Sequence, residues 1–165
     1  MGIKRIGKHL LVHRWQVRRT FPPEALALIE RTIKEGETTH SGQVRFAVEG
    51  ALDGKPLLKD QSARERALDI FSHLRIWDTA HNNGVLIYLL LADHDVEIVA
   101  DRGIDAKVGT AGWEMICKVM ETDFKAGNFT GGVIKGIQAV SQQLAAHFPK
   151  HGKGPNELPD KPVVI

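Results

Sequence analysis

The chain has 165 residues and a mass of 18.3 kDa, and 42% of its residues are hydrophobic and 25% charged. These values are typical of one globular domain, and they exclude a collagen, a coiled coil, a bundle of membrane helices and a fully disordered chain. The single cysteine, Cys117, excludes a disulfide framework, a four-thiolate zinc site and an iron–sulfur cluster.

Residues 1–21 form a basic N-terminal arm. Positions 1–20 contain six of the 22 basic residues and no acidic one, which leaves 16 basic and 20 acidic residues in the rest of the chain. Such an arm is typical of a contact with a protein partner or an anionic membrane surface, and it is equally consistent with a soluble lead-in segment. Trp15 either anchors at a membrane interface or packs on the body. A nucleic-acid partner is not expected, because the arm has few basic residues and the body is acidic.

The sequence predicts no transmembrane segment. No apolar run reaches the roughly 18 to 20 residues that cross a bilayer, and Leu10–Val12 is too short for the apolar core of a secretory signal. We therefore expect a cytoplasmic protein that is peripheral to a membrane at most.

Two helices and a strand are predicted in the first half of the chain. A helix begins at Pro22–Pro23, where proline fits the first turn, and ends at Gly36. Gln43–Val48 alternates apolar and other residues, as a strand does. Ser62 and Glu65 form a capping box, which opens a helix that we expect to end near Trp77.

A hairpin and two more helices follow. Val85–Ala92 is an unbroken apolar run, which indicates a strand buried on both faces, and Val96–Ala100 is its hairpin partner. Apolar stripes predict helices around Trp113–Phe124 and Val133–Phe148. Residues 149–165 have the composition of a flexible tail, although its last four residues can dock on the body.

This order of elements predicts an α/β fold. A strand–helix–strand unit favours parallel pairing, and a hairpin requires antiparallel pairing. The expected architecture is a three-layer α/β/α sandwich with a small mixed sheet.

One edge of this sheet is expected to collect polar residues. In a hairpin the start of the first strand lies beside the end of the second, so residues 78–84 should meet residues 101–103. If Gln43–Val48 runs parallel to Val85–Ala92, its start brings Glu37, His40 and Ser41 to the same edge.

The residues at this edge suggest a ligand site. Oxygen donors from Asp78, Asn83 and Asp101 suit Ca²⁺ or Mg²⁺. Arg102 suits an anion such as phosphate, and the imidazoles of His40 and His81 titrate near neutrality. The candidate ligand-binding residues are Asn82, Asn83, Gly84, Arg102, His40 and His81.

The same residues also have a purely structural interpretation, which is the alternative to a ligand site. Asp78 and Asn83 can cap turns through their side chains, Gly84 and Gly103 can supply positive φ, and Arg102 can pair with Asp101. The motifs of common nucleophilic enzymes and zinc proteases are absent from the sequence. We expect no nucleotide or redox cofactor.

Three segments resemble the TPM domain family over about residues 22–148: Thr39–Gln43, Trp77–Ile87 and Glu97–Gly103. The Asn-Asn-Gly-Val-Leu segment and the strand ending in Asp-Arg-Gly are the most specific, and the likeness is closest to the short proteobacterial branch. The resemblance implies a compact α/β/α sandwich. It also implies links to photosystem II repair in thylakoid-lumen relatives and acid phosphatase activity with a Ca²⁺ site in a plant relative.

We therefore expect an accessory binding module that holds a divalent ion or a small ligand at this edge. The alternative is a phosphomonoesterase in which Asp78 and Asp101 hold the metal ion and Arg102 holds the phosphate. A shared fold does not by itself transfer that activity.

Overall fold

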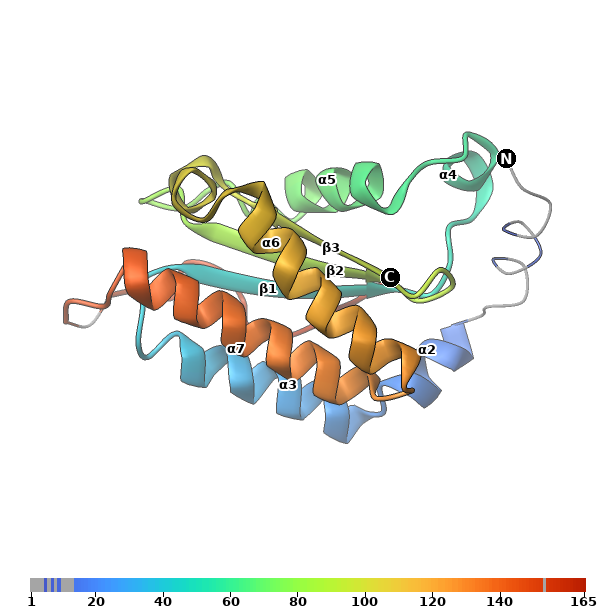
Figure 1. Ribbon diagram of the computed structural model, residues 1–165, viewed down its shortest axis with the longest axis horizontal. Coiled ribbons are helices and arrows are strands. Elements are labelled where there is room, and N and C mark those ends of the chain that lie inside the picture. Colours follow the sequence, from blue (N-terminus) through green and yellow to red (C-terminus); the bar gives the residue numbers. More distant parts are fainter. Residues whose placement is uncertain (1–4, 6, 8, 10–13, 153) are drawn as a thin grey trace.

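The computed structural model describes residues 5, 7, 9, 14–152 and 154–165. Its centre is a four-stranded sheet with the strand order β3-β2-β1-β4 (Figure 1). The strands are β1 (Gln43–Glu49), β2 (Gly84–Leu90), β3 (Asp95–Ala100) and β4 (Val163–Val164). The helices are α2 (Arg14–Thr20), α3 (Pro23–Gly36), α4 (Gly54–Leu58), α5 (Ala63–His73), α6 (Arg102–Lys125) and α7 (Phe129–His147).

The sheet is mixed, as the sequence predicts. β1 and β2 run parallel with Gln43 opposite Gly84, and β2 and β3 are antiparallel with Val85 opposite Ala100. These two registers bring the starts of β1 and β2 and the end of β3 to one edge of the sheet.

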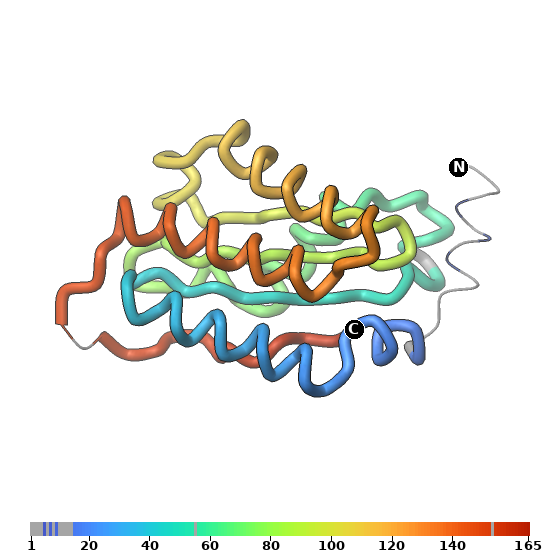
Figure 2. Tube along the Cα trace, turned by 60° about the horizontal axis from the view of Figure 1, so that its bottom comes forward, coloured from blue at the N-terminus to red at the C-terminus, as the bar shows by residue number. Residues whose placement is uncertain are grey.

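Helices cover both faces of the sheet, which confirms the predicted sandwich. α3 and α7 lie on one face with α6 beside them, and α5 lies on the other (Figures 1 and 2). Val85, Ile87 and Leu89 of β2 belong to the larger apolar cluster, whereas Leu86 and Leu90 belong to the cluster under α5. β2 is therefore buried on both faces, because successive side chains of a strand point to opposite sides.

Local signals set most helix boundaries. The Ser62 hydroxyl accepts the backbone N–H of Glu65, and the Glu65 carboxylate accepts that of Ser62, so the predicted capping box opens α5. α5 ends at His73, one turn before Trp77, because the chain then turns through Arg75, whose φ is +54°. α6 begins earlier than its apolar stripe, at Arg102, and is interrupted at Gly109, whose φ is +73°.

The C-terminal segment is expected to be a flexible tail whose last four residues can dock on the body, and the structure shows that docking. It returns along the sheet beside β1 (Figure 2), and Ala47 and Val48 pair in parallel with Val163 and Val164. The side-chain oxygen Oε1 of Gln43 accepts the backbone N–H groups of Glu157 and Leu158 at 3.0 and 2.8 Å. The local sequence gives little indication of β4, because this strand of two residues forms only by pairing with residues 116 positions away.

Cys117 is expected to be an unreactive thiol. Burial and the nearby Glu97 carboxylate raise its pKa to about 12, and the thiolate is the form that reacts with alkylating agents. At pH 8, iodoacetamide should label the native protein at least about 100-fold more slowly than the protein in denaturant. Mass spectrometry measures both rates, and rates within tenfold of each other would contradict the assignment.

Candidate functional site

The two segments predicted to meet do lie side by side. The backbone N–H of Asp101 donates to the Gly84 carbonyl at 2.9 Å, and the N–H groups of Gly103 and Ile104 donate to the Asn82 carbonyl at 2.9 and 3.2 Å. The N–H of Gln43 donates to the Asn83 carbonyl at 3.3 Å. Backbone hydrogen bonds therefore join the starts of β1, β2 and α6. We call the region formed by residues 37–43, 78–84 and 101–103 the polar edge.

Gly84 and Gly103 serve close approach and not positive φ. Among the described glycines, positive φ occurs at Gly54, Gly109, Gly127 and Gly152. A Cβ at Gly84 would lie 2.2 Å from the Ile76 carbonyl oxygen, and one at Gly103 would lie 2.5 Å from that of Asn82. The expectation of left-handed glycines at these two positions is therefore wrong, and the backbone packing of the polar edge explains their identity.

Asp101 and Asn82 have capping roles. Asp101 is the N-cap of α6, and its Oδ1 accepts the backbone N–H of Arg102 at 2.7 Å. Asn82 has a φ of +51°, and this turn directs its carbonyl at the next two N–H groups of α6. Such contacts satisfy the free donors of a helix start. The other carboxylate oxygen of Asp101, Oδ2, is buried and has no hydrogen-bond partner in the described part of the chain.

Asn83 is the most enclosed polar side chain of the polar edge. Its exposed fraction is 0%, and its amide nitrogen lies 3.5 Å from the Ser41 hydroxyl. Its Oδ1 accepts no hydrogen bond from any described residue. A buried carbonyl oxygen without a donor costs about 1–3 kcal/mol, so this atom needs an explanation.

His40 and Glu37 are buried titratable groups at the start of β1. The Nδ1 of His40 lies 3.1 Å from the Gly42 carbonyl, and burial lowers the pKa of the ring to about 4. His40 is therefore neutral at pH 7, and the expectation that it titrates near neutrality is wrong. Its Nε2 has no hydrogen-bond partner among the described residues. The Oε1 of Glu37 accepts the N–H of Val44 at 3.0 Å, and burial raises the pKa of this carboxyl to about 7.

A cavity of about 280 Å³ opens beside these groups. Residues from four chain segments line it. They are His40, Ser41, Gln43, Ala80, His81, Pro149, Lys150, His151, Gly154, Pro155 and Glu157. Three of the predicted polar-edge residues, His40, Ser41 and His81, thus share one cavity.

The C-terminal wall of this cavity has no signal in the local sequence. The Lys150 ammonium donates to the Glu37 carbonyl at 2.8 Å, and a Glu157 oxygen accepts the Ala80 N–H at 2.9 Å. These contacts join segments more than 70 positions apart, and no local pattern predicts them.

The three proposed metal ligands do not point to one place. Asp78 has a side chain that is 58% exposed and forms an ion pair with Arg75 at 3.3 Å. Asn83 is directed toward Ser41, and Asp101 toward the start of α6. Within the described residues there is no group of three His, Cys, Asp or Glu side chains placed to hold a metal ion. Arg102 is exposed at the first turn of α6.

A larger hollow of about 450 Å³ lies away from the polar edge, between α5, β3 and α6. Its acidic residues include Glu97, which lies 3.4 Å from Arg64. Arg64 also donates to the Ile98 carbonyl at 2.5 Å. This arginine therefore covers part of the outer edge of β3, where another strand would otherwise add.

Comparison with known proteins identifies the family. The TPM domain matches residues 18–143. The chain belongs to the TPM domain family. The NMR structure of BA42 from the psychrophilic bacterium Bizionia argentinensis is 30% identical, with a TM-score of 0.75 over 86% of this chain and 92% of that one.

A second TPM-like fold is more distant. The N-terminal domain of a P. gingivalis protein, solved by NMR, has a TM-score of 0.63 at 16% identity, over 85% of this chain and 94% of that one. This likeness shows the fold alone. Among curated proteins no match is found.

The helices in the described part of this TPM domain protein include no candidate for a membrane span.

Proposed function

We propose that this TPM domain protein is an accessory binding module that holds a divalent ion or a small polar ligand at the polar edge. The observation that carries the proposal is the fully buried side chain of Asn83, whose Oδ1 lacks a donor among the described residues. Its amide nitrogen contacts Ser41, a wall of the 280 Å³ cavity. A bound cation or hydrogen-bond donor would recover the free energy that this unpaired oxygen costs.

The donor set supports two kinds of ligand. The amide oxygen of Asn83 and the Oδ2 of Asp101 are hard oxygen donors, which suit Ca²⁺ or Mg²⁺, and Asp78 would join them only by leaving Arg75. On the cavity side, His81 and Lys150 suit a small anion such as phosphate. Asn82 and Gly84 supply the backbone that holds these groups, and Arg102 lies at the adjoining helix start.

The basic arm is the second part of the proposal, and its partner is a protein or an anionic membrane surface. The support is the charge difference between positions 1–20, with six basic and no acidic residues, and the acidic remainder of the chain. Opposite charge on a partner speeds encounter and selects against other surfaces.

Thermal unfolding of the full chain tests the ligand site. Calcium, magnesium and inorganic phosphate are added separately, because a ligand that binds only the native state must stabilise it. At ten times its Kd, the true ligand should raise Tm by about 3–6 °C. If none of the three shifts Tm at 10 mM, the proposal fails.

Asn83→Asp distinguishes the two ligand classes. The added negative charge should strengthen binding of a cation and abolish binding of phosphate, whereas Gln138→Glu, the same charge change at an exposed position of α7, should leave both unchanged. Equal shifts in the two variants would place the ligand elsewhere. Metal-dependent turnover of p-nitrophenyl phosphate by the same samples would favour the phosphomonoesterase over the binding module.

A further inference from the structure

Helix α2 presents an aromatic and basic face to solvent. Trp15 is 55% exposed, and Arg18 and Arg19 are also exposed. Residues three and four positions apart lie on the same side of a helix, so Arg18 and Arg19 lie on the side of α2 that carries Trp15, one turn further along. We call these three residues the tryptophan face.

The opposite side of α2 is fixed in the core. Val17 is 1% exposed and belongs to the large apolar cluster, as does Phe21 directly after the helix. α2 lies at one end of the molecule, beside the start of α3 (Figure 1). The tryptophan face therefore has a fixed orientation, and Trp15 and Arg19 also line a hollow of about 240 Å³ beside Leu91 and Phe129.

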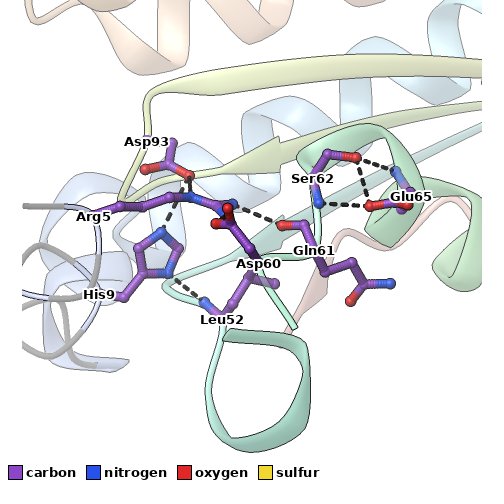
Figure 3. A network of polar contacts seen from close by, with 8 residues as sticks. All are labelled: Arg5, His9, Leu52, Asp60, Gln61, Ser62, Glu65 and Asp93. Carbon is purple, nitrogen blue, oxygen red and sulfur yellow. Dashed lines mark hydrogen bonds and ion pairs between the residues drawn. The ribbon is translucent and has the colours of Figure 1, made fainter. Parts of the chain in front are cut away.

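Two residues before α2 are also fixed to the body (Figure 3). Arg5 donates to Asp60 at 2.6 Å, to Asp93 at 3.1 Å and to the Gln61 carbonyl at 2.8 Å. The His9 ring is buried, its Nδ1 accepts the Leu52 N–H at 2.9 Å, and its Nε2 lies 3.1 Å from Asp93. These contacts anchor Arg5 and His9 themselves, whereas Val17 and Phe21 hold α2 against the core.

We propose that the tryptophan face docks on an anionic lipid surface, with the buried Val17 and Phe21 holding α2 in the orientation that this requires. The inference rests on the proposed partner role of the basic arm and chooses between its two partner classes. The indole ring has an apolar body and a polar N–H, which suits the headgroup region of a bilayer. Arginine side chains bind lipid phosphates, and each basic residue near an anionic surface contributes about 1 kcal/mol.

The exposed, one-sided arrangement favours a lipid surface over a protein partner. A helix at the end of the molecule, with its aromatic residue one turn before two cations, can lie flat on a planar surface. Orientation matters because a helix that is already fixed binds without the entropic cost of ordering its backbone.

Sedimentation of the full chain with vesicles tests the proposal. Vesicles of phosphatidylcholine with 30% phosphatidylglycerol should bind the protein, those of phosphatidylcholine alone should not, and 0.5 M NaCl should release it. The double variant Arg18→Glu/Arg19→Glu should bind at least tenfold more weakly. The control Lys107→Glu/Lys118→Glu makes the same charge change on exposed positions of α6 and should bind within about twofold of the native chain. Circular dichroism melting verifies that each variant is folded.

Fluorescence tests the place of the indole. On anionic vesicles the emission of the native chain should shift to the blue, and Trp15→Phe should remove the shift although Trp77 and Trp113 remain. The proposal is overturned if the native chain does not sediment, if the two double variants bind equally, or if the blue shift survives in Trp15→Phe. Asn83→Asp should sediment like the native chain, so failure of the ligand site and failure of the tryptophan face are separate results.

Discussion

Gly84→Ala should lower the free energy of unfolding by about 2–4 kcal/mol. The new Cβ would lie 2.2 Å from the backbone oxygen of Ile76 and 2.8 Å from its side chain. Gly84 is also paired on both sides, with Gln43 of β1 in register and with the Asp101 N–H bound to its carbonyl. The strand cannot move away from Ile76 without breaking contacts that build the polar edge.

Urea denaturation measures this effect, and Gly154→Ala is the matched control. A Cβ at Gly154 meets no atom within 4 Å and the backbone needs no positive φ, so the control should stay within about 0.5–1 kcal/mol of the native chain. If Gly84→Ala is as stable as the control, the close approach of Ile76 to the start of β2 is not present in solution.

Glu37→Gln should stabilise the protein at pH 8 by roughly 1–3 kcal/mol and have little effect at pH 4.5. Burial together with Asp160 raises the pKa of this carboxyl to about 7, against the lowering effects of the Val44 N–H and Lys150. The folded chain therefore holds a proton that the unfolded chain releases between about pH 4.5 and 7. The contribution of Glu37 to the free energy of unfolding is fully present below pH 4.5 and is lost as the pH rises through 7. Glutamine keeps an oxygen for the Val44 N–H and carries no charge beside Asp160.

His40 gives the free energy of unfolding the opposite pH dependence, and Glu37→Gln should reveal it because the effect of Glu37 is then removed. Burial lowers the pKa of His40 to about 4, so its contribution to stability is present above pH 6.5 and is lost as the pH falls through 4. In the native chain the two slopes oppose each other between about pH 4.5 and 6.5. In Glu37→Gln, stability should rise by roughly 3 kcal/mol from pH 4 to 6.5.

Urea denaturation at pH 4, 4.5, 6.5 and 8 gives the difference between the two proteins and the rise expected for the variant. Glu35→Gln is the control, because Glu35 is exposed two positions before Glu37, and its effect should stay within about 0.5 kcal/mol at each pH. A Glu37→Gln variant that is no more stable than the native chain at pH 8 would contradict the buried carboxyl.

The sequence predicts those parts of the fold that depend on local pattern. The unbroken apolar run of β2 and the capping box of α5 each have a signal within a few residues, and both are confirmed. The meeting of residues 78–84 with residues 101–103 also follows, because a hairpin fixes which strand ends are neighbours. Docking of the last four residues is foreseen, but the pairing of β4 with β1 and the contacts of Lys150 and Glu157 could not be predicted in this way, since they depend on distant segments.

The candidate site was harder to predict than the fold, because topology places backbones and not side chains. Asp78 belongs to the predicted loop, but its carboxylate pairs with Arg75 three positions earlier. Asp101 lies at the predicted strand end, where one of its oxygens caps α6. The full burial of Asn83 depends on the packing of three segments, and its sequence neighbourhood of turn residues suggests exposure.

The most direct test of the binding module is ¹H–¹⁵N NMR of the full chain titrated with Ca²⁺, Mg²⁺ or inorganic phosphate. We predict that one of these shifts the Asn83 side-chain amide resonances together with backbone amides of residues 40–43, 79–84 and 101–103, and that the same shifts saturate with one apparent Kd. Spectra in which the Asn83 amide stays unchanged up to 10 mM of each ligand, or in which shifts follow charge across the whole surface, would contradict a ligand site at the polar edge.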